Sequence, residues 1–236
     1  MRKFLFLLPI AAFILWWQSQ GGVLFPPLRA ITESLVNSGV IGHVAASLWR
    51  AAAGAAIGIS LGLLIGLLSG ASRAVRAILR PPLAFFMPIP GIALAPLFIL
   101  WLGFGWSTLV AVGALAAFFP VVVSVSEGVS SLDPSLMRAS MTLGVPKWRV
   151  YVPAAMVHLL SGLKLAWARA WRTVIACEFV AAASTGLGFM IWDASEYLRM
   201  STVYGGILLL MVVFMLSDWG LRAVEKRTVV KWGMVR

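Results

Sequence analysis

Long apolar blocks separated by short polar or basic segments constrain this chain more than any other feature. Each block is close to the roughly 20 residues that a helix needs to cross about 30 Å of hydrocarbon. The blocks cover residues 4–17, 48–70, 83–102, 106–125, 153–183, a longer helix that contains the fifth span, and 203–221. Because they are continuously apolar and do not alternate, they predict about six transmembrane helices and no barrel strands.

The composition excludes a soluble protein. The chain is 61% hydrophobic and 11% charged, whereas soluble domains carry about 25% charged residues. One cysteine excludes a disulfide framework, and two distant histidines argue against a metal site. We therefore predict an all-α polytopic membrane protein whose residues 1–236 form a single transmembrane domain.

The net charge of +11 is typical either of nucleic-acid binding or of membrane orientation. The basic residues lie in short patches between the apolar blocks, so we expect orientation and no nucleic-acid partner. With six spans, one side holds Arg2, Lys3, Arg73, Arg76, Arg80, Arg138, Lys147, Arg149, Arg222, Lys226, Arg227, Lys231 and Arg236; the other holds Arg29 and Arg199. The positive-inside rule then predicts that both termini are cytoplasmic. An uncleaved signal segment is the alternative for the first block.

Five glycines recur at every fourth position of the second block, at Gly54, Gly58, Gly62, Gly66 and Gly70. Residues four apart share a helix face, so these form a flat stripe that allows close helix approach. We expect internal helix packing, with a dimer contact or a moving gate surface as alternatives.

The third block is interrupted by Pro88, Pro90 and Pro96. Broken membrane helices occur where protein or a water-filled cavity surrounds the backbone, often beside a substrate path. A kinked packing helix and a pathway segment remain equal alternatives here.

Glu178 lies inside the fifth span, where a carboxylate costs at least a few kcal/mol unless it faces a partner or a cavity. We expect it to face the translocation path or a dimer interface, although a structural role remains an equal alternative. Arg172 is six residues away, about 240° around the helix, so any partner lies on another helix or is water. We interpret Arg169 and Arg172 as anchors near the cytoplasmic end or as a subunit contact.

The connections are predicted to be mostly irregular. A loop with Pro26-Pro27 precedes a surface helix that ends near Val40, and residues 73–80 form a basic connector that ends at Pro81-Pro82. Residues 184–201 are predicted to be a loop with a glycine turn at 186–188.

The cytoplasmic loop at residues 130–153 is the most informative segment. Asp133-Pro134 is a good helix start, Gly144 ends that helix, and a second short piece begins at Pro146. An amphipathic, basic helix–turn–helix on the cytoplasmic face is a docking element.

This loop resembles the E-A-A-x-x-x-G coupling motif of binding-protein-dependent ABC transporter permeases. The resemblance continues through Pro153-Ala154-Ala155, Ser161–Ala166, Arg169-Ala170-Trp171, Glu178 and Gly186-Leu187-Gly188, and upstream through Ser47–Arg50, Pro88-Ile89-Pro90, Ala95–Gly105 and Leu132-Asp133-Pro134. Together these segments resemble the subfamily for aliphatic sulfonates, taurine and nitrate. Arg138 stands where the family usually has Glu, and Ser140 replaces the second Ala of the motif.

The resemblance implies a type I importer permease of the bacterial inner membrane that forms the path for a small sulfonate-like anion or nitrate. It implies a homodimer, two ATPase subunits and an external solute-binding protein. The chain lacks a phosphate-binding loop, so we expect no cofactor and no enzyme activity of its own, with ATP bound by the partners. The implied coupling residues are Arg138, Ala139, Ser140, Leu143, Gly144, Lys147 and Trp148. The alternative is a secondary transporter or a structural subunit not driven by ATP.

Overall fold

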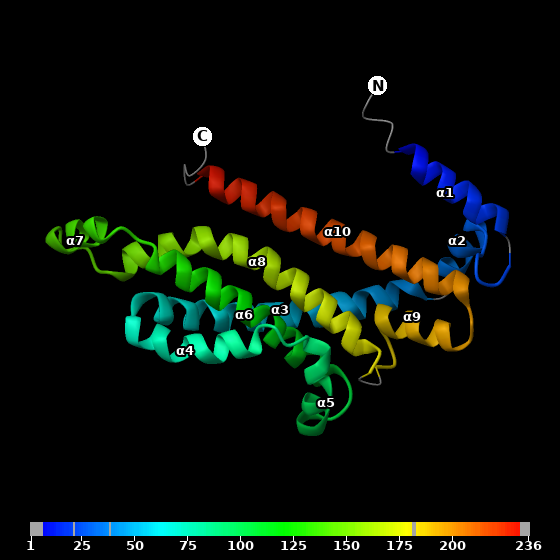
Figure 1. Ribbon diagram of the computed structural model, residues 1–236, viewed down its shortest axis with the longest axis horizontal. Coiled ribbons are helices and arrows are strands. Elements are labelled where there is room, and N and C mark those ends of the chain that lie inside the picture. The colour runs from blue at the N-terminus through cyan, green and yellow to red at the C-terminus, as the bar shows by residue number, and fades with distance from the viewer. Residues whose placement is uncertain (1–6, 21, 38, 181–182, 232–236) are drawn as a thin grey trace.

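A computed structural model describes residues 7–20, 22–37, 39–180 and 183–231, and the regular structure in these ranges is entirely helical. The helices run nearly end to end, joined by short connections (Figure 1). Their bounds are α1 Leu7–Gln20, α2 Leu28–Asn37, α3 Val40–Ala71, α4 Arg73–Phe86, α5 Gly91–Leu102, α6 Trp106–Ser130, α7 Pro134–Thr142, α8 Trp148–Glu178, α9 Leu187–Glu196 and α10 Met200–Lys231.

The glycine stripe of α3 lies against α6. A Cβ atom at Gly54 would sit 2.8 Å from the carbonyl oxygen of Val110, and one at Gly66 would sit 2.7 Å from the Cβ of Val125. Gly58, Gly62 and Gly70 face α6 in the same way. Residue numbers rise together along both contacting faces, so the two helices run parallel. The glycines lack side chains, which allows the α3 backbone to approach α6 closely.

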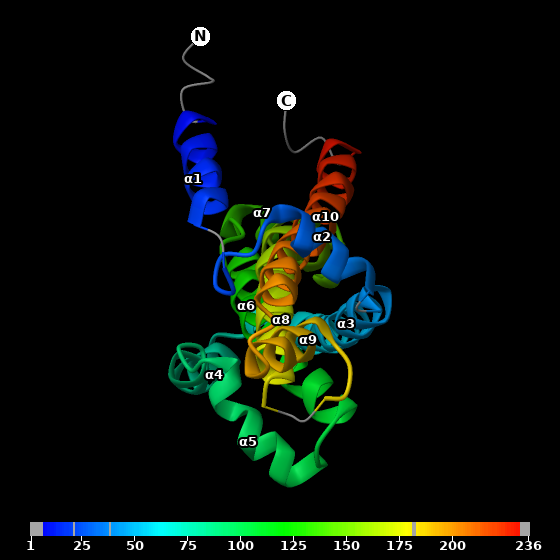
Figure 2. The ribbon, with the colours of Figure 1, turned by 90° about the vertical axis from the view of Figure 1, so that its right-hand side faces the viewer.

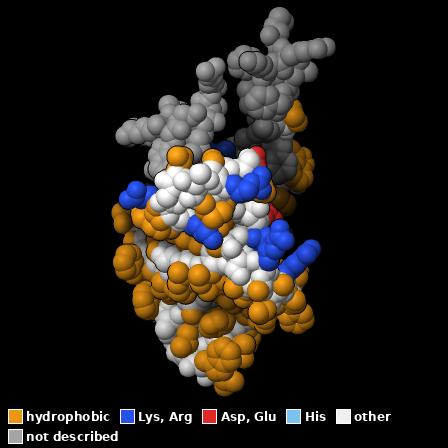
Figure 3. All heavy atoms as spheres, turned by 90° about the vertical axis from the view of Figure 1, so that its left-hand side faces the viewer, with side chains coloured by type: hydrophobic (Ala, Val, Ile, Leu, Met, Phe, Trp, Pro, Cys, Tyr) orange, Lys and Arg blue, Asp and Glu red, His pale blue; other side chains and the backbone are white. Residues whose placement is uncertain are grey.

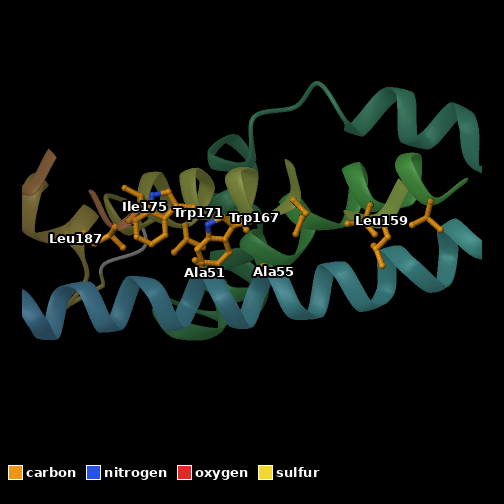
Figure 4. Packing of buried hydrophobic residues seen from close by; sticks show 14 of the residues in the cluster. Ala51, Ala55, Leu159, Trp167, Trp171, Ile175 and Leu187 are labelled. Carbon is orange, nitrogen blue, oxygen red and sulfur yellow. The ribbon is translucent and has the colours of Figure 1, made fainter. Parts of the chain in front are cut away.

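The third long helix, α8, completes the core. Trp167 and Trp171 stack with their ring centroids 6.1 Å apart, and both belong to the buried cluster that includes Ala51 and Ala55 of α3 (Figure 4). Small residues on α3 thus make room for the two large rings of α8. The Trp167 indole Nε1 also donates to Ser217 Oγ of α10 at 3.0 Å, which ties the last helix to this core.

Within the described residues, α3, α6 and the Met200–Ala223 part of α10 are long and apolar enough to span a membrane. The pair α4 and α5 would form a fourth span, but it is bent by 99° at residues 87–90, and α5 points away from the bundle (Figure 2). Helix α8 has 31 residues but carries Lys164, Arg169, Arg172 and Glu178 in its second half. The count of six spans therefore stays a prediction.

Three predicted connections differ from the structure. The basic connector at 73–80 is part of helix α4, which continues through Pro81 and Pro82 to Phe86; the fixed φ of proline fits a helix, at the loss of two backbone donors. The predicted loop at 184–201 contains helix α9, whose Leu187, Met190 and Ile191 are buried. The short piece after Pro146 is the first turn of the long helix α8. The surface helix before Val40 and the helix start at Asp133-Pro134 are confirmed.

Helix α7 lies at one end of the elongated molecule, whereas α2 and α9 lie at the opposite end (Figure 1). Seen toward the α7 end, the surface carries a group of lysine and arginine side chains with few acidic ones (Figure 3). Arg138, Lys147 and Arg149 are exposed in or beside α7, and Arg73 and Arg80 of α4 are also exposed. The α7 end of the bundle is therefore basic.

Candidate functional site

A pocket of about 500 Å³ lies where the chain breaks between α4 and α5. Residues 87–91 form one wall, α6 contributes Leu115 and Phe119, and α8 contributes Arg169, Arg172 and Thr173. Pro88 and Pro90 belong to the wall, whereas Pro96 lies inside α5 and does not line the pocket. The proline break thus borders a cavity of the size that small-molecule sites occupy.

Arg169 and Arg172 are one helical turn apart on α8 and both face this pocket. Their interpretation as anchors near the cytoplasmic end or as a subunit contact stays a prediction; α8 begins at Trp148, and Arg169 follows 21 residues later. At 1.5 Å per residue the two guanidinium groups lie roughly 30 Å along the helix from the α7 end. Arg169 is half-buried and Arg172 is exposed, so both lie far from the α7 end without being enclosed by the bundle.

Glu178 is 1% exposed and is enclosed by the chain itself. Its Oε1 lies 2.8 Å from Arg50 Nη1 of α3, with the Arg50 side chain only 10% exposed. The Gly188 N–H donates to Oε2 at 2.8 Å, and the Ser47 hydroxyl lies 2.9 Å from both carboxylate oxygens. The partner of Glu178 is therefore Arg50 on another helix, as the helical spacing predicted. The carboxylate is buried within the monomer and does not line the pocket.

The ion pair also fixes the turn after α8. Arg50 Nη1 donates to the carbonyl oxygen of Thr185 at 2.5 Å, and Nη2 donates to its Oγ1 at 3.1 Å. Gly186 has φ +135°, and a Cβ there would overlap the Glu178 carboxylate. Only glycine adopts this conformation without strain, so the glycine turn lies directly over the buried charge. We call Ser47, Arg50, Glu178, Thr185 and Gly188 the buried ion-pair network.

Sequence reasoning missed most of this network. Ser47 and Arg50 lie 131 and 128 positions before Glu178, so no local spacing relates them. One signal could have found the pair: Arg50 and Glu178 both lie within apolar blocks, and opposite charges inside a membrane are expected to pair.

The segment from α7 to the start of α8 forms a helix–turn–helix. The Asp133 carboxylate accepts from the Ser135 N–H at 2.7 Å, which caps α7 and lowers the pKa of that carboxyl. Gly144 has φ +68°, the left-handed conformation that ends helices. Leu143 and Trp148 flank the turn and are 79% and 61% exposed.

The predicted coupling residues divide into two groups. The exposed group around the turn comprises Arg138, Ala139, Leu143, Gly144, Lys147 and Trp148. Ser140 is buried, and its carbonyl oxygen accepts from the Val145 N–H at 2.9 Å. Ser140 therefore holds the turn together, whereas the exposed residues present a surface with apolar and basic side chains.

Residues 58–230 match the family described as binding-protein-dependent transport system inner membrane component. The taurine transport system permease protein TauC of Escherichia coli is 32% identical over 90% of this chain and 83% of its own length. The putative aliphatic sulfonates transport permease protein SsuC of Bacillus subtilis is 34% identical over 96% and 86%. The bicarbonate transport system permease protein CmpB of Synechococcus elongatus is 27% identical over 90% and 85%.

The family match covers most of the chain and agrees with the resemblance found in the sequence. Relatives of this kind are permease subunits that depend on a separate ATPase and a solute-binding protein, and are not enzymes themselves. A secondary transporter is not favoured. The chain therefore belongs to the binding-protein-dependent inner-membrane components and is the multi-pass permease subunit of an ATP-driven importer.

Proposed function

We propose that this permease imports a small sulfonate-like anion and that the turn between α7 and α8 couples the path to the ATPase. The observation that carries the coupling role is the exposure of Leu143 and Trp148 on a basic, solvent-facing turn. Exposed apolar side chains that gather on one surface outside the membrane mark an interaction site, and tryptophan and arginine are enriched among the residues that dominate contact energies. Arg138, Lys147 and Arg149 surround them and fit acidic groups on the partner.

The coupling role is tested by two substitutions at Gly144. Its φ of +68° disfavours valine, whereas asparagine tolerates this conformation; a Cβ at this site meets nothing within 4 Å, so steric clash does not contribute. Gly144→Val is expected to leave membrane insertion intact and to abolish the stimulation of ATP hydrolysis by the solute-binding protein. Gly144→Asn is expected to retain most of it. Normal transport by Gly144→Val, or a loop cysteine that never cross-links to the ATPase, contradicts the proposal.

The substrate class rests on the relatives, whose names specify taurine, aliphatic sulfonates and bicarbonate. We propose a sulfonate or a related small anion, with nitrate as a further candidate. The test is a thermal-shift screen of the partner solute-binding protein with taurine, methanesulfonate, bicarbonate, nitrate, a neutral sugar and an organic cation. Stabilisation by one or more of the anions or by taurine is expected. Stabilisation by the sugar or the cation alone contradicts the substrate class.

We further propose a homodimer of this chain with two ATPase subunits, and an orientation with both termini and α7 in the cytoplasm. The basic side chains at the α7 end support the orientation (Figure 3). Ser130 is exposed and Ser195 is half-buried, at opposite ends of the molecule, and the buried Cys177 is replaced by alanine as background. In intact cells an impermeant thiol reagent should label Ser195→Cys and spare Ser130→Cys. The reverse pattern contradicts the orientation.

A further inference from the structure

We propose that Arg169 and Arg172 form an anion-binding site inside the permease, which holds the sulfonate or carboxylate group of the solute after the solute-binding protein releases it. The inference deepens the proposed substrate class and rests on it. It assigns a role in solute recognition to the membrane subunit itself. The shared chemistry is a small oxyanion, and the phosphate of a lipid headgroup is the competing source.

The guanidinium groups retain most of their hydrogen-bonding capacity. Arg169 Nη1 is 3.4 Å from the carbonyl oxygen of Met87, and Arg172 Nε donates to the carbonyl oxygen of Ala168 in its own helix at 3.0 Å. Each guanidinium has five N–H donors. Within the described part of the chain, the ion pairs involve other basic residues: Arg29, Arg50, Lys164, Arg199 and Arg222. Two cations therefore share one pocket without an acidic partner there.

The remaining walls of the pocket also suit an anion. Its lining residues include no Asp or Glu, and Thr173 offers a hydroxyl group between the two arginines and Ala176. Helix α5 begins at Gly91 in the same wall, and Pro90 caps it without a side-chain hydrogen bond. The first N–H groups of a helix carry a partial positive charge. The pocket thus combines full and partial positive charges.

Both residues face an open pocket, with Arg169 half-buried and Arg172 exposed, so their free donors are accessible to a solute. A charged side chain within the bilayer is costly and is expected to face a water-filled cavity or a partner. Two arginines one turn apart repel each other, a cost that an anion between them removes. The two arginines and the non-helical residues 87–90 line the same cavity of about 500 Å³. This volume exceeds the size of a small sulfonate and leaves room for water.

The test measures the electrostatic potential of the pocket without knowledge of the solute. In the assembled importer with Cys177→Ala, a cysteine is placed at 172 by Arg172→Cys. Its reaction rates are measured with the anionic 2-sulfonatoethyl and the cationic 2-trimethylammonioethyl methanethiosulfonate. A positive charge about 6 Å away in a hydrated pocket changes each rate about threefold in opposite directions. Arg169→Gln should therefore lower the anion-to-cation rate ratio about tenfold.

The control is Ser195→Cys on α9, outside the pocket lining, where Arg169→Gln should leave the ratio unchanged. Methanesulfonate should also slow the reaction at position 172 when Arg169 is present. A ratio that Arg169→Gln changes less than twofold, or a cysteine at 172 that neither reagent reaches, overturns the proposal. The proposal is also overturned if phosphatidylglycerol in nanodiscs slows the reaction of the cysteine at 172 while methanesulfonate does not. That pattern assigns the site to a lipid.

The experiment separates this inference from the substrate proposal. If the solute-binding protein binds no sulfonate or other anion while the rate ratio responds to Arg169→Gln, the substrate class is wrong and the pocket remains an anion site. If the solute-binding protein binds a sulfonate and the ratio does not respond, the substrate class stands and the site inside the permease does not.

Discussion

The buried ion-pair network predicts that Arg50 and Glu178 are strongly coupled in stability. Breaking a buried ion pair by removing one partner costs about 3–5 kcal/mol, because the remaining charge has no counter-ion. Glu178→Leu leaves Arg50 with only Thr185 as acceptor, and Arg50→Met leaves the carboxylate with only neutral donors. Each single variant should therefore lose about 4 kcal/mol of unfolding free energy.

The double variant should recover part of this loss. Without either charge, the Ser47 hydroxyl and the Gly188 N–H still lack their acceptor, at about 1–3 kcal/mol each. We expect a total loss of about 5 kcal/mol where independent sites would give about 8, a coupling energy of about 3 kcal/mol. The assay is unfolding of the purified permease by sodium dodecyl sulfate in mixed micelles, with all four members of the cycle measured together.

A matched control exists in the same protein. Lys164 and Glu225 form an ion pair between α8 and α10 with side chains 30% and 23% exposed. Solvent-exposed pairs contribute about 0–1 kcal/mol, so the cycle of Lys164→Met and Glu225→Gln should show a much smaller coupling. Additive losses at Arg50 and Glu178, or a Glu178→Leu variant as stable as the wild type, would refute the reasoning. Transport that stays lost in a stable double variant would instead support a pathway role for Glu178.

Three further predictions follow from local geometry. Gly54→Ala places a methyl group 2.8 Å from a backbone oxygen of α6 and should cost about 1–3 kcal/mol of stability in the same unfolding assay, whereas Gly42→Ala in the same helix meets nothing within 4 Å and should be neutral or slightly stabilising. The lowered pKa of Asp133 means that its contribution to α7 is present above the ordinary value of 3.8 and is lost as pH falls through the lower folded value; the protection of α7 amides, taken relative to the intrinsic exchange rate at each pH, should therefore fall in acid, and Asp133→Asn should remove this pH dependence of the protection. Gly186→Ala forces the turn away from Glu178 and should destabilise the protein as much as loss of the ion pair; a neutral effect in thermal unfolding would contradict the tight turn.

The sequence contained enough to predict the membrane class, the glycine stripe and the helix–turn–helix around Gly144. These features depend on local properties, namely hydropathy over about 20 residues, a spacing of four, and turn chemistry at one glycine. The partner of Glu178 was out of reach, because Arg50 is 128 positions away and only the folded chain brings the two together.

The missed helix and the missed pocket have different physical causes. Helix α9 begins beside Gly186 and Gly188 and has only 10 residues, so packing of Leu187 and Ile191 stabilises it more than propensity does. The pocket arises from the 99° bend between α4 and α5. Prolines indicate that a helix breaks, but the angle depends on what the two halves pack against.

The contact between α3 and α6 limits which motions can open and close the path. Gly58, Gly62, Gly66 and Gly70 meet Ala117, Val121, Val125 and Val129, so both partners repeat every four residues. Sliding or rolling one helix over the other by less than a full turn would drive these side chains into the facing backbone. The two helices are therefore expected to move as one rigid unit. Alternating access would then use connections outside this pair, of which the non-helical residues 87–90 and 143–147 are two.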